Sequence, residues 1–580
     1  MSDRWIAAAA VLTAAAARLA LGVPLWVVVA AVLAAVLVRR PPLLCIALVL
    51  AAGWHGHREL SGLTPPASVS VSAWVTLVSD AEPGDFGTSA DVRLGARRFV
   101  LRASGAPASE LASATTGTRL RVKGRLGPLA HRTASSVSRH LAGVVVAASI
   151  TARERGSWPW ILADRVRATL DRGAASVGRE TQSLFDGLVL GDDRHQDDVA
   201  RHRFRASGLS HLLVVSGENV AFVLVAAAPL LERMTTRWRF AATILVLLAF
   251  GTVVRWEPSV LRAIAMSAVA ATAAVSGRHA SGIRVVSVAV IGVVFIDPLI
   301  VWSMGFLLSV AATAGLVLLA RPISRRLPGP RSAADALGVV LAAQIGAAPV
   351  LVAAFGVVPA MGLVANLVAV PAAGWVMVWG CTAGFIAGVV PPWAAGFIHL
   401  PTRLLAWWIS TVARLAATPG LPQWGPVELG LVALGVVVVL AGARRPRVRS
   451  LAVPVVVVAL FLGVRPPRAG THPVGIGSRV LVGAGGEVAL VLGGRVRVAG
   501  TLDALAALHV ASPDLVIVTS VGASHAASAI ASELDDPRVV AADPTRLRGA
   551  RRLVAGVISV GTLDLAVDVH GRGFMVRSLS

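Results

Sequence analysis

Long apolar runs recur from Trp5 to Val464, and they constrain the fold of this 580-residue chain more than any other feature. Alanine, valine, leucine and glycine dominate the runs, and each run is near the roughly 20 residues that an α-helix needs to cross a bilayer. Only 15% of the residues are charged, against about 25% in an ordinary soluble domain. The chain is therefore predicted to be a polytopic α-helical membrane protein.

Three apolar segments at 4–22, 23–38 and 41–56 form a predicted N-terminal transmembrane region, 1–57. Arg39 and Arg40 separate the second segment from the third, and cationic loops of this kind stay in the cytoplasm. The N-terminus is therefore expected inside, and no clear cleavage site marks it as a removed signal peptide. The net charge of +23 is therefore weak evidence for nucleic-acid binding, because many arginines lie in short loops where they set topology.

Residues 66–150 change character and predict a soluble domain outside the membrane. Alternating or β-branched stretches are separated by Gly, Pro and Asp, as in a run of short strands. Five strands of this kind suit a small OB-like β-barrel. The stretches are SVSVSAWVTLV (68–78), SADVRL (89–94), ARRFVLRA (96–103), GTRLRVKGRL (117–126) and LAGVVVAASI (141–150).

Residues 68–150 contain ten cationic and five anionic residues. The positive-inside rule does not explain this excess of positive charge in a domain outside the membrane. Two interpretations stay open, a surface that contacts phosphates and an ordinary solvated face. The candidate DNA-binding residues here are Arg97, Arg98, Arg121 and Lys123, and the available stacking residues are Trp74, Phe86 and Phe99.

The rest of the chain divides into three predicted regions. Residues 158–211 begin with an amphipathic helix at 158–175, expected to lie on the membrane. Residues 212–464 hold roughly ten further spans, with an ambiguous part at 391–427 and a last span at 450–464. Residues 465–580 alternate again and predict a small α/β domain, which topology places outside.

Polar residues at the entrance to the 212–464 region mark a candidate conduit. A charge at the bilayer centre costs roughly 2.5–3.5 kcal/mol on insertion scales, so it normally faces a cavity or a partner. Glu218 and Arg262 are candidates for such a pair or for lining the path, although a snorkelling arginine is the alternative. Ser216–Gly217 and Pro258 can break a helix. Two roles stay open for His211: it donates a hydrogen bond to a phosphate, or it is a structural histidine at the membrane interface.

The stretch GLVLGDDRHQDDVARHRFRASGLSHLLVVSGENV (187–220) resembles the signature of the ComEC/Rec2 family of competence membrane proteins. The family pattern joins a Gly–Asp pair, a charged stretch ending in a Phe–small–Gly step, and His-Leu-Leu-x-Val-Ser-Gly. Four more elements follow in the family's order: PSVLRAIAM (258–266), DPLIVWSMGFLLSVAATAG (297–315), AAQIGAAPVLVAAFG (342–356) and ANLVAVPAAG (365–374). One departure is Glu218–Asn219–Val220, where the family commonly has a histidine after the Ser–Gly step.

The resemblance implies an inner-membrane channel through which single-stranded DNA enters during natural transformation. The implied channel or DNA-binding residues are Asp192, His211, Ser216, Gly217, Glu218, Asn219 and Arg262. Expected partners are single-stranded DNA and the lipid bilayer, with a DNA receptor, a cytoplasmic DNA-translocating ATPase and a second copy of the chain as further candidates. No Walker A motif is present, so another protein or a gradient must drive transport.

Many family members end in a metallo-β-lactamase-like domain, whose hallmark is a strand running into His-x-His-x-Asp-His. Here the strand DLVIVTS (514–520) is followed by a segment in which Ser520, Gly522 and Ser524 occupy ligand positions, and His525 alone remains. A catalytic zinc needs about three protein ligands. We therefore expect a degenerate domain with no catalytic residue, metal or cofactor.

Three functions were weighed on these features. A membrane-tethered hydrolase is disfavoured because the C-terminal region lacks the metal ligands that such an enzyme needs. A transporter of another polyanion or of a small solute would share the polar intramembrane residues. The ordered motifs and the cationic 66–150 domain favour the DNA channel over that alternative.

Overall fold

The computed structural model describes residues 2–84, 87–213, 217–275, 281–418, 421, 423–431, 469–475, 477–494, 496–508, 510, 512–534, 537–547, 550–570 and 573–579. These residues form two compact units. The first comprises Met1–His195, Val214–Val350 and Ala373–Ala406, and the second comprises Gln196–Leu213, Leu351–Ala372 and Trp407–Ser580.

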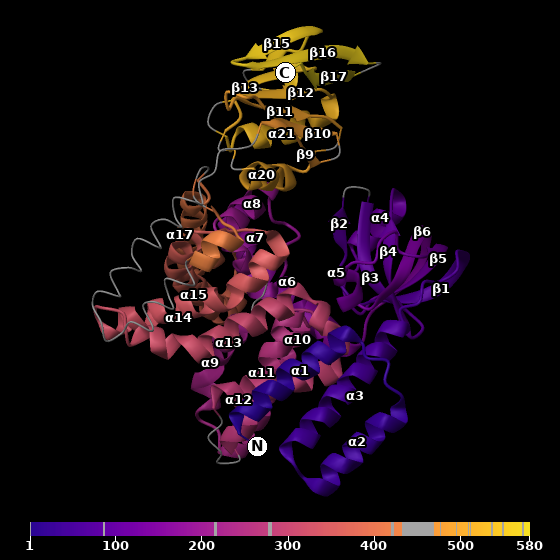
Figure 1. Ribbon diagram of the computed structural model, residues 1–580, viewed down its shortest axis with the longest axis vertical. Helices are drawn as coiled ribbons and strands as arrows, with labels where there is room; N and C mark the ends of the chain where they lie inside the picture. Colours follow the sequence, from indigo (N-terminus) through magenta and orange to yellow (C-terminus); the bar gives the residue numbers. More distant parts are fainter. Residues whose placement is uncertain are drawn as a thin grey trace. The chain divides into compact units, whose positions relative to one another are not determined.

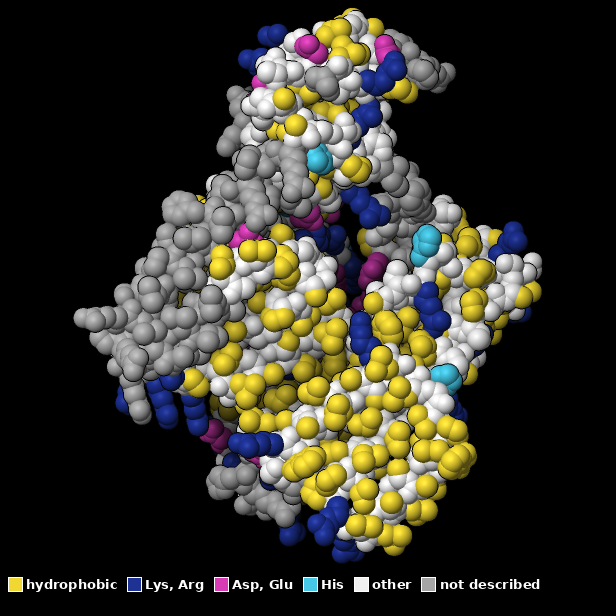
Figure 2. All heavy atoms as spheres, viewed as in Figure 1, with side chains coloured by type: hydrophobic (Ala, Val, Ile, Leu, Met, Phe, Trp, Pro, Cys, Tyr) yellow, Lys and Arg dark blue, Asp and Glu magenta, His cyan; other side chains and the backbone are white. Residues whose placement is uncertain are grey.

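Three helices begin the first unit and match the three predicted apolar segments: α1 (Asp3–Leu19), α2 (Leu25–Val38) and α3 (Pro41–Ser61). Helices α1 and α3 pack so closely that a side chain at Gly56 would collide with the carbonyl oxygen of Ala17. The outer face of α2 stays apolar and uncovered, with Trp26 at 72% and Leu37 at 79% exposure. Figure 2 shows such hydrophobic side chains gathered over the lower part of the view, as expected for a surface that faces lipid.

All five predicted strands of the 66–150 region are confirmed, and a short extra strand joins them (Figure 1). The sheet has the order β1-β5-β6-β4-β3-β2, and β1 also pairs with β3 at Thr76↔Arg93 and Leu77↔Val92. The pair β4–β6 is parallel. The elements are β1 (Val69–Leu77), β2 (Glu82–Gly84), β3 (Gly87–Leu94), β4 (Arg97–Ala103), α4 (Ala106–Ala112), β5 (Arg119–Gly127), α5 (Ala134–Ser138) and β6 (Leu141–Glu154).

Strand alternation builds the core of this β-domain, because successive side chains of a strand point to opposite faces. On β5, Leu120 and Val122 are 1% exposed, and they join buried Val75, Phe99 and Leu101 in one cluster. The cations of β5 lie at the alternate, exposed positions.

The predicted amphipathic helix is α6 (Trp158–Ala174), followed by η1 (Ala175–Val177), α7 (Arg179–Phe185) and the π-helix η2 (Asp186–Leu190). Close packing joins α6 to the end of α15, since a side chain at Gly388 would collide with the Thr169 carbonyl oxygen. In the second unit, α8 (Asp198–Ala206) and η3 (Ser210–Leu212) cover the rest of the motif segment before residue 213.

Helices dominate the chain from residue 217 to 416. Among the described residues, α10, α13, α14 and α15 are long and apolar enough to cross a membrane, and α2, α9, α12 and residues 259–273 are shorter apolar helices. The predicted last span, 450–464, lies outside the described residues. The elements are α9 (Gly217–Leu231), α10 (Thr236–Val253), α11 (Pro258–Val275), α12 (Gly282–Ile296), η4 (Pro298–Trp302), α13 (Met304–Ser324), α14 (Arg331–Phe355), β7 (Val358–Pro359), α15 (Gly362–Ala387), α16 (Pro392–Ile398), α17 (Leu400–Ala416) and β8 (Gln423–Trp424).

Small residues bring α13 and α14 into backbone contact. A side chain at Gly315 would meet the Ala342 carbonyl oxygen and the Gly346 Cα, and one at Gly346 would meet the Ala311 carbonyl oxygen. Small residues of this kind let membrane helices approach closely, where packing replaces the hydrophobic effect as the source of stability.

Three layers make up the C-terminal domain. The middle layer is a six-stranded sheet of order β14-β13-β12-β11-β10-β9, and one of its faces packs against the three-stranded sheet β15-β16-β17 through Leu481, Val491 and Ile517. The other face packs against helices through Val480, Leu490 and Val516. The elements are β9 (Gly470–Gly475), β10 (Ser478–Val482), β11 (Val488–Leu492), α20 (Val498–Ala507), β12 (Leu515–Val518), η5 (Val521–Ala523), α21 (Ser524–Ala531), β13 (Arg538–Ala541), η6 (Pro544–Arg546), β14 (Arg551–Arg552), β15 (Gly556–Val560), β16 (Leu563–His570) and β17 (Gly573–Ser578).

The predicted α/β character of the tail is thus confirmed, and its helical layer contains an unexpected member. Val199 of α8 belongs to the same buried cluster as Val480 and Leu502. Arg203 of α8 forms an ion pair with Glu533, and its Nε donates to that carboxylate at 2.9 Å. A segment of the motif region is therefore part of the C-terminal domain.

Candidate functional site

The Gly191–Asp192 turn ends the π-helix η2. Gly191 has φ 68°, a left-handed conformation that favours glycine. The backbone carbonyl of Asp186 accepts hydrogen bonds from the amides of both Gly191 and Asp192, the latter at 3.0 Å. A π-helical turn is rare and is found mostly at functional sites. The local geometry thus explains why glycine precedes this aspartate.

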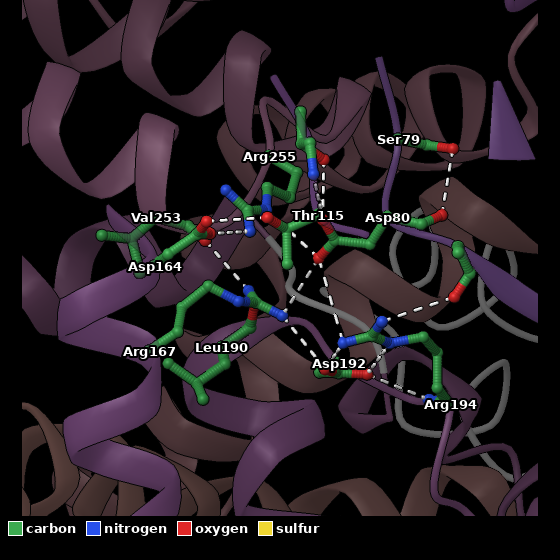
Figure 3. Close-up of polar contacts among 12 residues, drawn as sticks. Ser79, Asp80, Thr115, Asp164, Arg167, Leu190, Asp192, Arg194, Val253 and Arg255 are labelled. Carbon is green, nitrogen blue, oxygen red and sulfur yellow. Dashed lines mark hydrogen bonds and ion pairs between the residues drawn. The ribbon is translucent and has the colours of Figure 1, made fainter. Parts of the chain in front are cut away.

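Two arginines hold the carboxylate of Asp192 (Figure 3). Arg167 Nη2 donates to Oδ2 at 3.1 Å, and Arg194 Nε donates to Oδ1 at 2.7 Å. Burial alone would raise the pKa of Asp192, but the hydrogen bonds and charges of Arg194 and Arg167 outweigh it and lower the pKa to about 2. Asp192 is therefore ionised at neutral pH.

Arg167 continues the network in two directions. Its Nη1 donates to the carbonyl oxygens of Leu190, at 2.7 Å, and Val253, at 2.9 Å. Its Nη2 also lies 3.5 Å from Asp80 Oδ2, in the β-domain. The side chain is 10% exposed, so its partners replace most of the hydration that the guanidinium loses.

Asp80 and Asp164 share a third arginine, Arg255. Arg255 donates from Nε to Asp80 at 3.2 Å and from Nη2 to Asp164 at 2.5 Å, and its guanidinium lies 5.6 Å from the Trp160 ring centre. Asp80 also accepts the amide and hydroxyl of Thr116, at 2.8 and 2.7 Å. Although burial acts against it, the charges of Arg255 and Arg167 lower the pKa of Asp80.

Together these residues form a charge-balanced cluster, the Asp/Arg network, defined as Asp80, Asp164, Asp192, Arg167, Arg194 and Arg255 (Figure 3). It joins the β-domain, α6, the Gly191–Asp192 turn and the segment between α10 and α11. Three carboxylates meet three guanidinium groups in it, which suits positioning rather than the capture of a free ion. Arg255 and the next residue, Trp256, have φ of 63° and 58°, so the network holds a strained turn in place.

Sequence reasoning singled out only Asp192 in this network. Asp164 and Arg167 lie within 158–175, the helix that the sequence predicts to lie on the membrane surface. The side chain of Arg167 is instead buried against the turn and the end of α10. The sequence shows only that these charged residues flank apolar runs. That pattern does not identify which charged residues pair with one another.

A second group of charges lies beside the network. Burial, with smaller contributions from the carboxylates of Asp193 and Glu82, raises the pKa of Glu257 to about 7, and the charge of Arg139 opposes that rise. Burial likewise raises the pKa of Glu82. Arg139 Nε itself donates to Asp91 at 2.7 Å. Burial thus favours the protonated form of Glu257.

The predicted helix break is where two helices begin. Helix α9 begins at Gly217 and α11 at Pro258, while Ser216 lies outside the described residues. A side chain at Gly217 would collide with Nη2 of Arg262 and would approach the Cβ of Ala263 at 3.2 Å. Two predicted residues from distant motifs are thus in contact.

The other polar residues of this region have separate surroundings. Arg262 is 4% exposed and donates from Nη1 to the Thr313 hydroxyl at 2.7 Å and to the Ser309 carbonyl oxygen at 3.2 Å. Asn219 is buried and donates to the Leu188 carbonyl oxygen at 2.8 Å. Glu218 is exposed in the first turn of α9. Its pairing with Arg262 stays a prediction.

His211 lies in η3 of the second unit. Its side chain is exposed, and its ring hydrogen-bonds to the backbone of Gly208. Among the predicted family elements, Asp297 caps η4 by accepting the Leu299 amide at 3.0 Å, and it also lies 2.9 Å from Nε2 of His140. That contact is a second tie between the β-domain and the helices of the first unit.

The predicted basic residues of the β-domain separate into two groups. Arg121 and Lys123 are exposed on β5 at alternate positions with Arg119 and Arg125, and these four residues form what we term the β5 stripe. Lys123 and Arg125 line an open groove of about 790 Å³ with Ser70 and Ser72 of the neighbouring strand. Arg97 and Arg98 are instead half-buried on β4, where Arg97 donates to the Thr64 carbonyl oxygen and burial lowers the pKa of Arg98.

The three aromatic residues predicted to be available for base stacking differ in their exposure. Trp74 is half-buried on β1 with the Arg119 guanidinium 5.3 Å from its ring centre. Phe99 is 3% exposed and belongs to the domain core, so the expectation that it stacks on bases is wrong. Phe86 lies outside the described residues.

In the C-terminal domain the predicted strand is β12, and the segment that follows it contains η5 and α21. Ser520 accepts the Gly494 amide at 3.2 Å, Ser524 is buried, and His525 is exposed. The Ser524 hydroxyl has no hydrogen-bond partner among the described residues. The degenerate metallo-β-lactamase-like origin of the domain stays a prediction.

Residues 188–448 match the family model described as Competence protein. The matched segment starts at the π-helix and includes the Gly191–Asp192 turn, the contact of Gly217 with Arg262, and the four helices long enough to cross a membrane. No curated protein and no solved structure matches the chain.

Proposed function

We propose that the chain conducts single-stranded DNA across the cell membrane during natural transformation, because residues 188–448 match the family model of competence proteins. The observation that carries the proposal is this matched segment, whose described part holds four helices able to span a bilayer. Two polar side chains of the matched segment, Arg262 and Asn219, are buried near the starts of α11 and α9, where they contact Gly217 and the Leu188 carbonyl oxygen.

The β-domain supplies a surface for the strand before it enters. The pairing of β1 with β3, added to the order β1-β5-β6-β4-β3, supports an OB-like barrel. The predicted topology of the N-terminal helices would put this barrel on the outer side of the membrane. The β5 stripe places a cation at every second residue, roughly 6.6 Å apart in a strand. That spacing is about twice the 3.4 Å rise per nucleotide along one strand of a duplex, so it suits an extended single strand.

The same proposal gives a location to the C-terminal domain and roles to the expected partners. The C-terminal domain lies outside with the β-domain, as a metallo-β-lactamase-like remnant without catalysis. A DNA receptor would deliver the strand and a cytoplasmic ATPase would draw it inward. A second copy of the chain completes the assembly.

A gene deletion tests the proposal directly. Cells without the gene should bind labelled DNA but fail to bring it into the cytoplasm, and a plasmid copy should restore entry. Normal entry of labelled DNA into the deletion strain would overturn the assignment. In a second test, the purified chain should bind single-stranded oligonucleotides with an affinity that falls as salt rises.

A further inference from the structure

Asp186 is a buried carboxyl group that neither the family match nor the proposed transport explains. It starts the π-helix η2 and is 3% exposed. Its Oδ1 has no hydrogen-bond partner among the described residues. An ionised carboxylate in such a place would be costly, so the group must be neutralised in another way.

A second carboxyl group, Asp171 of α6, interacts with the Asp186 side chain, and a shared proton removes one negative charge from the two groups. The side chains of Asp186 and Asp171 hydrogen-bond to each other. Two carboxylates cannot form a hydrogen bond unless one of them carries a proton. Asp171 is exposed and accepts a further hydrogen bond from Nε2 of Gln182 at 2.7 Å, so the pair connects a buried oxygen to solvent.

We propose that Asp186 and Asp171 form a proton-binding site, in which the two carboxyl groups share one proton and its release creates a second buried carboxylate beside Asp192. The proton leaves through exposed Asp171, and the pair gains one negative charge. The new carboxylate then competes with Asp192 for Arg167. The site takes a proton as its ligand, and it does not rest on the transport of DNA.

The surroundings of Asp186 support one shared proton. The charged groups that act on it are Asp171 and Arg167 of α6 and Asp192 after η2. On α15, the residues in contact with neighbouring Phe185 are the uncharged Gly380 and Gly384, and the ring of His399 packs edge-on against Phe185 at 5.4 Å. Burial, followed by the charges of Asp171 and Asp192, raises the pKa of Asp186 to about 8, and Arg167 opposes that rise.

The consequence falls on the Gly191–Asp192 turn. The backbone carbonyl of Asp186 holds the amides of that turn, while its side chain shares the surroundings of Arg167. Loss of the proton therefore loosens the bond between Arg167 and Asp192 and, with it, the turn. The protonated pair corresponds to the closed Asp/Arg network described above.

Infrared titration of the full chain in nanodiscs tests the site without any DNA. The wild type should lose a protonated-carboxyl band with a midpoint near pH 8, and Asp186→Asn should lack that component. Asp171→Asn should lower the midpoint, because the like charge is gone and an amide can donate to the carboxylate. Glu180→Gln, which removes an exposed carboxyl on α7, should change nothing, and Glu257→Gln should remove a separate component near pH 7.

Thermal unfolding of the same proteins gives a second readout. The folded state holds a proton that the unfolded state releases between pH 3.8 and about 8, so wild-type stability falls across that window. Asn cannot ionise, so the melting temperature of Asp186→Asn should exceed that of the wild type by a margin that grows up to about pH 8 and then stays constant. An unchanged band in Asp186→Asn, or a constant margin across the window, would overturn the proposal.

Discussion

The backbone of Gly217 lies directly against the guanidinium group of Arg262. Gly217 begins α9, and Arg262 lies one turn into α11, where Thr313 and Ser309 of α13 hold its other side. Three helices of the segment matched by the family model therefore meet at one buried cation. A residue without a side chain is required at this point because the cation occupies the space that a Cβ would fill.

Gly217→Ala should destabilise the chain and reduce DNA entry. The new methyl group displaces Nη2 of Arg262, while Nη1 of the same guanidinium is bonded to Thr313 and Ser309, and overpacking of this kind costs about 1–3 kcal/mol. Thermal unfolding in detergent and uptake of labelled DNA measure the two effects. Gly292→Ala on α12 is the matched control, since a Cβ there meets nothing within 4 Å. Equal behaviour of the two variants would contradict the contact.

Asp80→Ala should destabilise the packing of the β-domain against the helices of the first unit. The change leaves Arg255 and Arg167 with unbalanced charge in a buried place, and breaking a buried ion pair costs about 3–5 kcal/mol. Arg255→Ala should cost a similar amount. The double variant should cost less than the sum of the two, with a coupling energy of about 0.5–3 kcal/mol from thermal unfolding. Strict additivity would show that the pair does not interact.

Asp192 should make the protein sensitive to acid. Its pKa is lowered from 3.8 to about 2, so it contributes stability above pH 3.8 that is lost as the pH falls toward 2. The loss is on the order of 2 kcal/mol for a shift of that size. Melting temperatures measured from pH 5 to pH 2 should fall more steeply for the wild type than for Asp192→Asn. Parallel curves would argue against an ionised, arginine-bound Asp192.

The β5 stripe should carry the salt dependence of DNA binding. Removing Arg121 and Lys123 together, as alanines, takes two cations from the stripe, and each lost phosphate contact lowers the slope of log K against log salt by about 0.7 for a single strand. Fluorescence anisotropy with a labelled oligonucleotide measures the slope on the full chain. Arg233→Ala removes an exposed cation from the turn between α9 and α10 and should leave the slope unchanged. A slope that drops equally in both variants would place DNA elsewhere.

The ion pair between Arg203 and Glu533 should hold α8 on the C-terminal domain. Glu533→Arg places two cations together and should expose the 196–206 segment to protease, whereas adding Arg203→Glu should restore protection. Limited proteolysis followed by mass spectrometry reads the cleavage. Protection that does not return in the double variant would mean that the pair contributes little to docking.

The elements of the fold could be predicted because local patterns determine them. Alternation located the five long strands between residues 69 and 154, and helical periodicity located α6 within one residue of its end. Apolar runs located α1 to α3. What the patterns could not predict was pairing across the chain, because register depends on contacts between distant residues.

The candidate site was predicted only in part for the same reason. Asp192 and Gly217 stood out through their motif, and Arg262 through its place in an apolar run. Their partners did not, since Arg167 and Asp80 are ordinary charged residues until folding brings them within hydrogen-bonding distance of Asp192 and Arg255. Burial of Asp186 was equally invisible, because a lone aspartate next to an apolar run usually marks the end of a helix at the surface.

The membership of α8 in the C-terminal domain also imposes an order on synthesis. Val199 packs against Val480 and Leu502, so its core place does not exist until the ribosome has made the last region of the chain. Domains generally fold as units during synthesis, with N-terminal parts first. Here a stretch of the competence motif must wait, unpacked, while every intervening helix is inserted. The motif therefore acquires its final form last, and a nascent chain cut short before residue 480 would leave α8 without its core.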